Sequence, residues 1–138
     1  MILDTSGLLA AADSSAREHA ECLGALSAAT GPLLLSPFVA AELDYLITNY
    51  LGAAAALRWI DEVAAGAYQL EPFSATDVAG AATVMRRHAD LAVGLADASL
   101  VILAERHGVG EVLTLDQRHF RTLTWDRGRP FRLLPADA

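Results

Sequence analysis

Lysine is absent from this chain of 138 residues, and all ten of its basic residues are arginines. This absence excludes sites that depend on a lysine amine: the phosphate-binding loop of P-loop enzymes, Schiff-base chemistry, and receiver-type aspartate phosphorylation. Acidic residues outnumber the arginines and give a formal net charge of −7. This charge argues against a general electrostatic attraction to nucleic acid, which is itself an anion.

Cysteine is also scarce, since Cys22 is the only one. A single cysteine excludes an internal disulfide and a zinc site built from cysteines, and it fits a cytoplasmic protein. No uncharged apolar run reaches about 18 residues, so we predict no membrane span. The first apolar stretch has no basic lead-in and contains Asp4, which indicates a strand of the fold rather than a signal peptide.

Short apolar runs alternate with segments of helical spacing, and apolar residues make up 54% of the chain. The expected strands cover residues 1–3, 33–35, 68–71, 111–115 and 131–134. The expected helices cover residues 15–29, 38–50, 53–65, 76–88 and 97–107. Strands that alternate with helices predict the α/β class, with one domain over residues 1–138 and a central parallel sheet flanked by helices on both faces.

Two acidic residues follow predicted strands. Asp4 comes directly after the strand 1–3, and Asp116 lies just past the core of the strand 111–115. The carboxyl ends of parallel strands meet at one edge of the sheet, where ligands of open α/β sheets bind. Two carboxylates at this edge repel each other, and a divalent cation is the natural compensation.

Two further acidic residues lie on predicted helices. The period of the helix 38–50 places Glu42 on the face of Phe38 and Tyr45, which we expect to point inward. Asp97 opens a very apolar helix, where the exposed amides of the first turn favour a negative charge. Taken singly, each acid has a simpler interpretation as a helix cap, a turn residue or a surface residue. Together they form a coherent set of four.

Oxygen ligands suit hard cations, so the four acids favour Mg²⁺, with Mn²⁺ as a substitute. Such an ion can activate water and stabilise the leaving oxygen of a phosphodiester. Hydroxyl groups of Thr5, Ser6 and Thr114 lie beside the acids in sequence and could orient a carboxylate or a bound water.

Four segments around these acids resemble a known protein family. The segments ILDTSGLLA, SPFVAAELDYL, GLADASLVILAERHG and VLTLDQRHF occur in the order and at the spacing of PIN-domain ribonucleases, specifically VapC-type toxins of bacterial toxin–antitoxin pairs. The resemblance covers essentially the whole chain. It implies that the family's catalytic acids fall on four residues, and that three of them bind the metal. The four are Asp4, Glu42, Asp97 and Asp116, and the three expected metal ligands are Asp4, Asp97 and Asp116.

The resemblance also implies an activity and partners. It implies endonucleolytic cleavage of RNA, either transfer RNA or ribosomal RNA, which would inhibit translation and growth. It further implies a homodimer and a VapB-type antitoxin that covers the acidic pocket. A non-catalytic domain that binds a partner through the same acids remains the alternative. A phosphohydrolase of the haloacid dehalogenase kind is disfavoured, because Ser6 stands where that family needs an aspartate and the chain has no lysine.

Half of the arginines follow closely after Asp116, at positions between 118 and 132. An arginine-rich edge beside an acidic pocket would bind phosphate groups while the pocket holds the metal. We therefore expect Arg118, Arg121 and His119 to contact RNA. The alternative is that these arginines are solvated and paired with acids such as Asp126.

Overall fold

Five short parallel strands form the central sheet of the computed structural model, which describes residues 1–138. The strands are β1 (Ile2–Leu3), β2 (Leu34–Leu35), β3 (Gln69–Leu70), β4 (Glu111–Leu113) and β7 (Arg132–Leu134), in the spatial order β3-β2-β1-β4-β7. Ile2 pairs with Leu34 on one side and with Val112 on the other. All three side chains are fully buried, as expected for strands covered on both faces.

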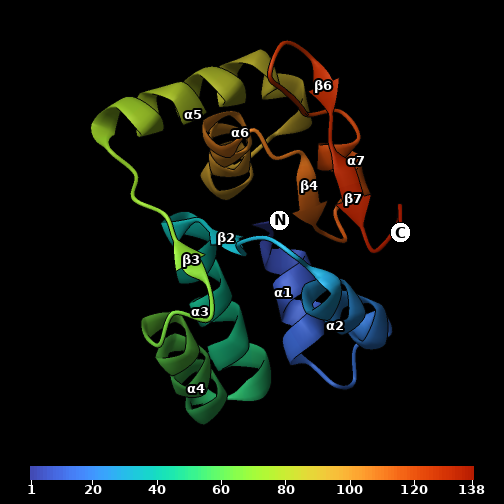
Figure 1. Ribbon diagram of the computed structural model, residues 1–138. Helices are drawn as coiled ribbons and strands as arrows, with labels where there is room; N and C mark the ends of the chain where they lie inside the picture. The colour runs from blue at the N-terminus through green and yellow to red at the C-terminus, as the bar shows by residue number, and fades with distance from the viewer.

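Helices connect the strands and cover the sheet (Figure 1). They are α1 (Thr5–Ala12), α2 (His19–Ala28), α3 (Pro37–Leu51), α4 (Ala53–Ala64), α5 (Ala75–Arg87), α6 (Leu95–His107) and the short α7 (Gln117–Phe120), with a 3₁₀ turn at Ala89–Leu91. In Figure 1, α5 and α6 gather on one side of the sheet, and α1 and α2 lie on the other. The predicted α/β class with a parallel sheet is confirmed. None of these helices combines the length and hydropathy needed to cross a membrane.

The strand order reverses beside β1. From β1 the chain passes outward through β2 to β3, and it then returns to place β4 on the other side of β1. The carboxyl ends of β1 and β4 therefore flank the switch point of the sheet, the position at which open α/β folds bind ligands. Asp4 follows β1, and Thr114 follows β4.

Helix α1 follows β1 without a loop and was not predicted from the sequence. Its residues are small or apolar on every side, so its periodicity cannot be told from that of a buried strand. Gly7 lets this helix approach β4, because a Cβ atom there would lie 2.7 Å from the backbone oxygen of Leu113. The prediction for the next helix began too early, since residues 13–18 form turns and α2 begins at His19.

The last part of the chain holds a second element that the sequence did not predict. Strands β5 (Thr124–Trp125) and β6 (Arg129–Pro130) form a small antiparallel hairpin ahead of β7. These strands consist of Thr-Trp and Arg-Pro, so they lack the apolar run that indicated the equally short strands β1 and β2. The hairpin places Trp125 against Phe131, near the buried Phe120 of α7.

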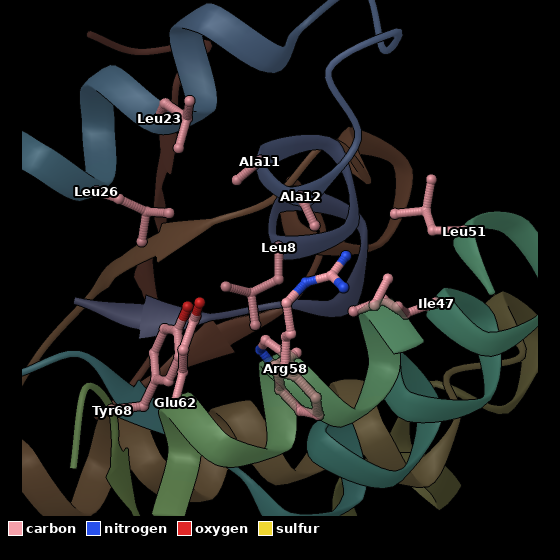
Figure 2. Close-up of a pocket in the computed structure, with 12 residues that line it drawn as sticks. Leu8, Ala11, Ala12, Leu23, Leu26, Ile47, Leu51, Arg58, Glu62 and Tyr68 are labelled. Carbon is pink, nitrogen blue, oxygen red and sulfur yellow. The ribbon is translucent and has the colours of Figure 1, made fainter. Parts of the chain in front are cut away.

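An apolar pocket lies between the pair α1 and α2 and the pair α3 and α4 (Figure 2). Its volume is about 300 Å³. Leucine and isoleucine side chains from three helices line it, among them Leu8, Leu26 and Ile47. Figure 2 also shows the Arg58 side chain extending from α4 into the pocket. The four acidic residues singled out in the sequence do not line this pocket.

Candidate active site

Asp4 occupies the end of β1 and is almost completely buried, with 4% of its surface exposed. Its backbone N–H donates to the carbonyl oxygen of Leu113 at 3.0 Å, which fixes the residue against β4. Its Oδ2 accepts hydrogen bonds from Ser6 Oγ at 2.6 Å and from Thr114 Oγ1 at 2.7 Å. The same carboxylate caps the N-terminus of α1. The carboxylate is thus held in one orientation by the start of a helix and by two hydroxyl groups.

The two hydroxyl groups are themselves oriented by the backbone. Ser6 Oγ accepts the N–H of Leu115 at 2.9 Å, and Thr114 Oγ1 accepts the N–H of Asp116 at 2.9 Å. Each hydroxyl therefore accepts from the backbone and donates to Asp4. Of the three hydroxyl residues singled out in the sequence, Ser6 and Thr114 support Asp4. The buried Thr5 hydroxyl has no hydrogen-bond partner in the protein.

Three side chains converge beside Asp4. The Nδ1 atom of His119 lies 2.8 Å from Asp97 Oδ2 and 3.0 Å from Asp116 Oδ2. One ligand atom from each of these residues falls within 4.8 Å of the others. Thr114 connects this group to Asp4, because its hydroxyl donates to Asp4 and accepts from the backbone of Asp116. We call Asp4, Asp97, Asp116 and His119 the acidic centre.

The carboxylates of the acidic centre have no arginine partner among the ion pairs of the structure. Burial, followed by the charge of Asp4, raises the pKa of Asp97 to about 6, although hydrogen bonding to His119 acts in the opposite direction. Burial also raises the pKa of Asp4, and the hydroxyls of Ser6 and Thr114 offset part of this effect. The acidic centre therefore concentrates negative charge that the protein itself compensates only in part.

The local role of each acid differs from the simplest sequence interpretation. Helix α6 begins after Gly94, so Asp97 lies within the first turn and is not its cap. Its side chain pairs with His119 instead. Asp116 does cap a helix, because its Oδ1 accepts the N–H of His119 at the start of α7. Its second oxygen still faces the acidic centre, so capping and membership of the cluster are compatible in this residue.

The expected inward orientation of Glu42 was wrong. Glu42 is exposed, and Tyr45 on the same face is 68% exposed. The buried stripe of α3 consists of Val39, Leu43 and Ile47, which recur every four residues. The sequence prediction failed because α3 is apolar on several faces, so its pattern does not single out the one that packs. Glu42 forms no hydrogen bond or ion pair with the acidic centre.

His119 was expected to contact RNA, and the structure places it differently. Its side chain is only 17% exposed, and both ring nitrogens are occupied, since Nε2 lies 3.1 Å from the carbonyl oxygen of Leu91. The spacing of Asp116 and His119 in the sequence could have indicated their contact. Residues three apart on a helix share a face, so Asp116 and His119 can contact each other. The spacing between histidines alone does not indicate a carboxylate partner.

The expected arginine-rich edge is mostly occupied by internal ion pairs. Arg121 binds Asp137 through two hydrogen bonds of 2.9 and 2.6 Å. Two other members of the group are paired as well, Arg129 with Asp126 and Arg132 with Glu111. The alternative of paired surface arginines therefore describes these three. Arg118, directly after Gln117, is exposed and forms no ion pair.

The chain is similar to known proteins over almost its whole length. The family model described as PIN domain matches residues 1–125. The chain belongs to the PIN-domain family. The PIN domain here is 38% identical over 135 residues to Ribonuclease VapC26 of Mycobacterium tuberculosis (strain ATCC 25618 / H37Rv), covering 98% of this chain and all of that protein. This similarity assigns it to the VapC-type ribonuclease toxins within the family.

A solved structure agrees with the fold of this PIN domain. The crystal structure of Mycobacterium tuberculosis VapC20, described as a Sarcin-Ricin loop cleaving toxin, superposes with a TM-score of 0.80. The match covers 89% of this chain and 95% of VapC20, at 16% sequence identity. At this identity the likeness establishes the fold alone. It confirms the arrangement of a parallel sheet with helices on both faces.

The donor set of the acidic centre fits a divalent metal ion. PIN domains are generally metal-dependent, and the clustered carboxylates here supply the oxygen ligands that hard cations prefer. A cation would also relieve the repulsion from Asp4 and Asp116, which adds to the effect of burial in raising the pKa of Asp97. The buried Thr5 hydroxyl adds a polar group next to Asp4 that the protein leaves without a partner. The oxygen ligands and the clustered negative charge of these residues therefore suit a divalent metal ion.

Proposed function

We propose that this chain is a Mg²⁺-dependent endoribonuclease toxin that cleaves transfer or ribosomal RNA and is neutralised by a cognate antitoxin. The observation that carries the proposal is the acidic centre, in which Asp97 and Asp116 meet at His119, Thr114 connects them to the buried Asp4, and no carboxylate has an arginine partner. The similarity to Ribonuclease VapC26 supports RNA as the substrate class.

Asp4, Asp97 and Asp116 would hold the metal, which supplies Lewis-acid activation of water and stabilisation of the leaving oxygen. Ser6 and Thr114 keep the Asp4 carboxylate in a fixed orientation through hydrogen bonds of 2.6 and 2.7 Å. A ligand fixed in this way loses little conformational freedom when the ion binds. This arrangement explains why hydroxyl residues surround the buried carboxylate.

Glu42 would act from outside the acidic centre. It is exposed on α3. The N-cap residue of this helix, Ser36, contacts α6 through a hydrogen bond between Ser36 Oγ and Ser99 Oγ at 2.7 Å. Ser99 lies two residues after Asp97 on α6. From this helix Glu42 would orient or deprotonate the attacking water once RNA is bound, which suits a solvent-accessible carboxylate.

An acidic protein needs a local positive charge to hold RNA. Arg118 lies two residues after Asp116, is exposed and has no acidic partner. We assign it the contact with a phosphate group next to the cleaved bond, since a guanidinium binds phosphate with two hydrogen bonds. Arg121 would contribute less, because Asp137 already occupies its guanidinium.

The antitoxin that covers the acidic centre would also be anchored at the apolar pocket of Figure 2. We assign this pocket to an amphipathic helix of a VapB-type antitoxin, whose apolar face would cover Leu23 and Leu51 at its rim. Arg58 extends into the pocket and is absent from the ion pairs of the structure, so it can bind an acidic residue of that helix. The walls of the pocket include α1, the helix that Asp4 caps.

We also propose a homodimer that acts in the cytoplasm. Tyr45 and Tyr50 on α3 are 68% and 71% exposed, and Leu57 on α4 is 62% exposed. Large exposed apolar groups on two helices that pack together favour a protein interface. Sedimentation of the purified protein tests the dimer, and a monomer across the micromolar range would contradict it.

The function is tested by incubating purified protein with total RNA in Mg²⁺ and in chelator, and by sequencing the new RNA ends. Internal cuts at defined sites that require Mg²⁺ are expected. The alternative function, a non-catalytic domain that binds a partner, predicts no cleavage in either condition. Sequencing the ends also identifies whether transfer RNA or ribosomal RNA is the substrate.

A further inference from the structure

His119 is the one residue of the acidic centre that contributes a ring nitrogen instead of a carboxylate oxygen. Its Nδ1 atom lies 2.8 Å from an oxygen of Asp97 and 3.0 Å from an oxygen of Asp116. This atom therefore occupies the space between two of the carboxylates that we assign to the metal. A ring placed there must either be displaced when a cation enters or take part in binding it.

Two contacts hold the ring in place. Its Nε2 lies 3.1 Å from the carbonyl oxygen of Leu91, and because a carbonyl only accepts, Nε2 must carry the proton. This contact directs the Nδ1 side toward Asp97 and Asp116, whose carboxylate oxygens also only accept, so a cation that binds Nδ1 takes the place of the proton that Nδ1 donates to them. Histidine ligands of metals are typically fixed in this way, by donation of the second ring N–H to a backbone carbonyl.

The backbone that carries the ring is also rigid. The N–H of His119 donates to Asp116 Oδ1 at 3.0 Å, so His119 and Asp116 are bound to each other through both backbone and side chain. The next residue, Phe120, is 1% exposed and packs edge-on against Phe131. Turning the ring away from the acidic centre would break the contact of Nε2 with the carbonyl oxygen of Leu91, so retention of the ring is favoured over displacement.

We infer that His119 is a direct ligand of the catalytic metal through Nδ1, together with Asp97 and Asp116. The inference rests on the proposed function, because it concerns the same metal. It makes the site a mixed nitrogen and oxygen site instead of an all-carboxylate one. Imidazole suits transition metals better than Mg²⁺, so the protein binds Mn²⁺ more tightly relative to Mg²⁺ than an all-oxygen site would.

The direct test uses Mn²⁺ alone as the probe. Electron spin echo envelope modulation of Mn²⁺ bound to the full chain detects a coordinated imidazole nitrogen. We expect ¹⁴N modulation in the parent, its replacement by ¹⁵N modulation when the histidines are ¹⁵N-labelled, and its loss in His119→Gln. His88→Gln is the matched control, since His88 forms no side-chain hydrogen bond, and it should keep the modulation. The labelled parent decides the question even if His119→Gln folds poorly.

A binding titration gives a second readout that does not depend on activity. In His119→Gln we expect the affinity for Mn²⁺ to fall about ten- to a hundredfold, with a smaller loss for Mg²⁺. Bound Mn²⁺ without nitrogen modulation in the parent would overturn the role of His119 and leave the proposed ribonuclease intact. Equal losses for both metals would also overturn it. Failure of the parent to bind Mn²⁺ would instead contradict metal dependence itself.

Discussion

Two buried carboxylates in this protein have opposite surroundings. Asp4, at the carboxyl end of β1, is 4% exposed and contacts only hydroxyl and backbone groups. Glu71, directly after β3, is 6% exposed, and its oxygens contact Arg106 at 2.9 Å and His107 at 2.8 Å. Gln69 donates a further hydrogen bond to Glu71 at 2.6 Å. One carboxylate is therefore compensated by the protein, and the other is not.

The pKa values reflect this difference. Burial raises the pKa of Glu71, but hydrogen bonds from His107, Gln69 and Arg106 outweigh it, so the net shift is downward. The pKa of Asp4 is raised, because hydroxyl groups offset only part of the effect of burial. A compensated acid holds the fold together, here by joining β3 to the end of α6. An uncompensated acid costs stability, and its presence at a sheet edge indicates a site for a cation.

The largest effect is expected at the compensated acid. Glu71→Ala leaves His107 without its partner and Arg106 with only Asp77 and the carbonyl oxygen of Pro72, and it should lower the free energy of unfolding by about 3 kcal/mol, as measured by urea denaturation. Glu105→Ala, an exposed neighbour on α6, is the control and should change it little. A loss no larger than in the control would show that the Glu71 network is not structural.

Asp97, whose charge is compensated only in part by His119, should respond in the opposite direction. In chelator at neutral pH, Asp97→Asn removes a charge that the fold disfavours and should raise the free energy of unfolding by about 2 kcal/mol. Asp44→Asn, at an exposed position on α3, serves as the control. If Asp97→Asn melts below the parent, the carboxylate contributes to stability through His119, and the comparison with Glu71 fails.

The pH dependence of stability sharpens the same comparison. The folded chain keeps a proton on Asp97 up to pH about 6, whereas the unfolded chain loses it near pH 4. The contribution of Asp97 is therefore complete below pH 4 and is lost as the pH rises through 6. The difference in unfolding free energy between Asp97→Asn and the metal-free parent should grow by about 2 kcal/mol over this window. A difference that does not change with pH would contradict the raised pKa.

The smallest expected effect extends the comparison to arginines. Arg118 has no partner, whereas Arg121 is paired with Asp137. Arg118→Glu should weaken RNA binding several-fold more than Arg121→Glu at low salt, since each phosphate contact adds to the salt-dependent affinity. Both variants should bind Mn²⁺ as the parent does. Fluorescence anisotropy with a labelled RNA measures the difference, and equal affinities for parent and Arg118→Glu would remove Arg118 from the RNA contact.

The sheet and the acids that follow β1 and β4 could be predicted because both follow from local sequence. Apolar runs locate the strands, and parallel topology brings residues after β1 and β4 together whatever the helices do. The orientation of Glu42 could not be predicted, because α3 is apolar on several faces and tertiary packing selects one of them. Contacts between distant residues were equally hidden. Glu71 and Arg106 are 35 residues apart, and nothing near Glu71 in sequence indicates its partner.

Cleavage by Asp4→Asn tests the central claim most directly. This variant keeps the capping and hydrogen-bonding geometry at the end of β1 but removes the charge that would hold the metal. With purified parent, Asp4→Asn and the control Asp44→Asn, we expect Mg²⁺-dependent cuts in total RNA from the parent and the control, and none from Asp4→Asn. Cleavage by Asp4→Asn at the rate of the parent, or cleavage by the parent in chelator, would contradict a metal-dependent ribonuclease whose active site is the acidic centre.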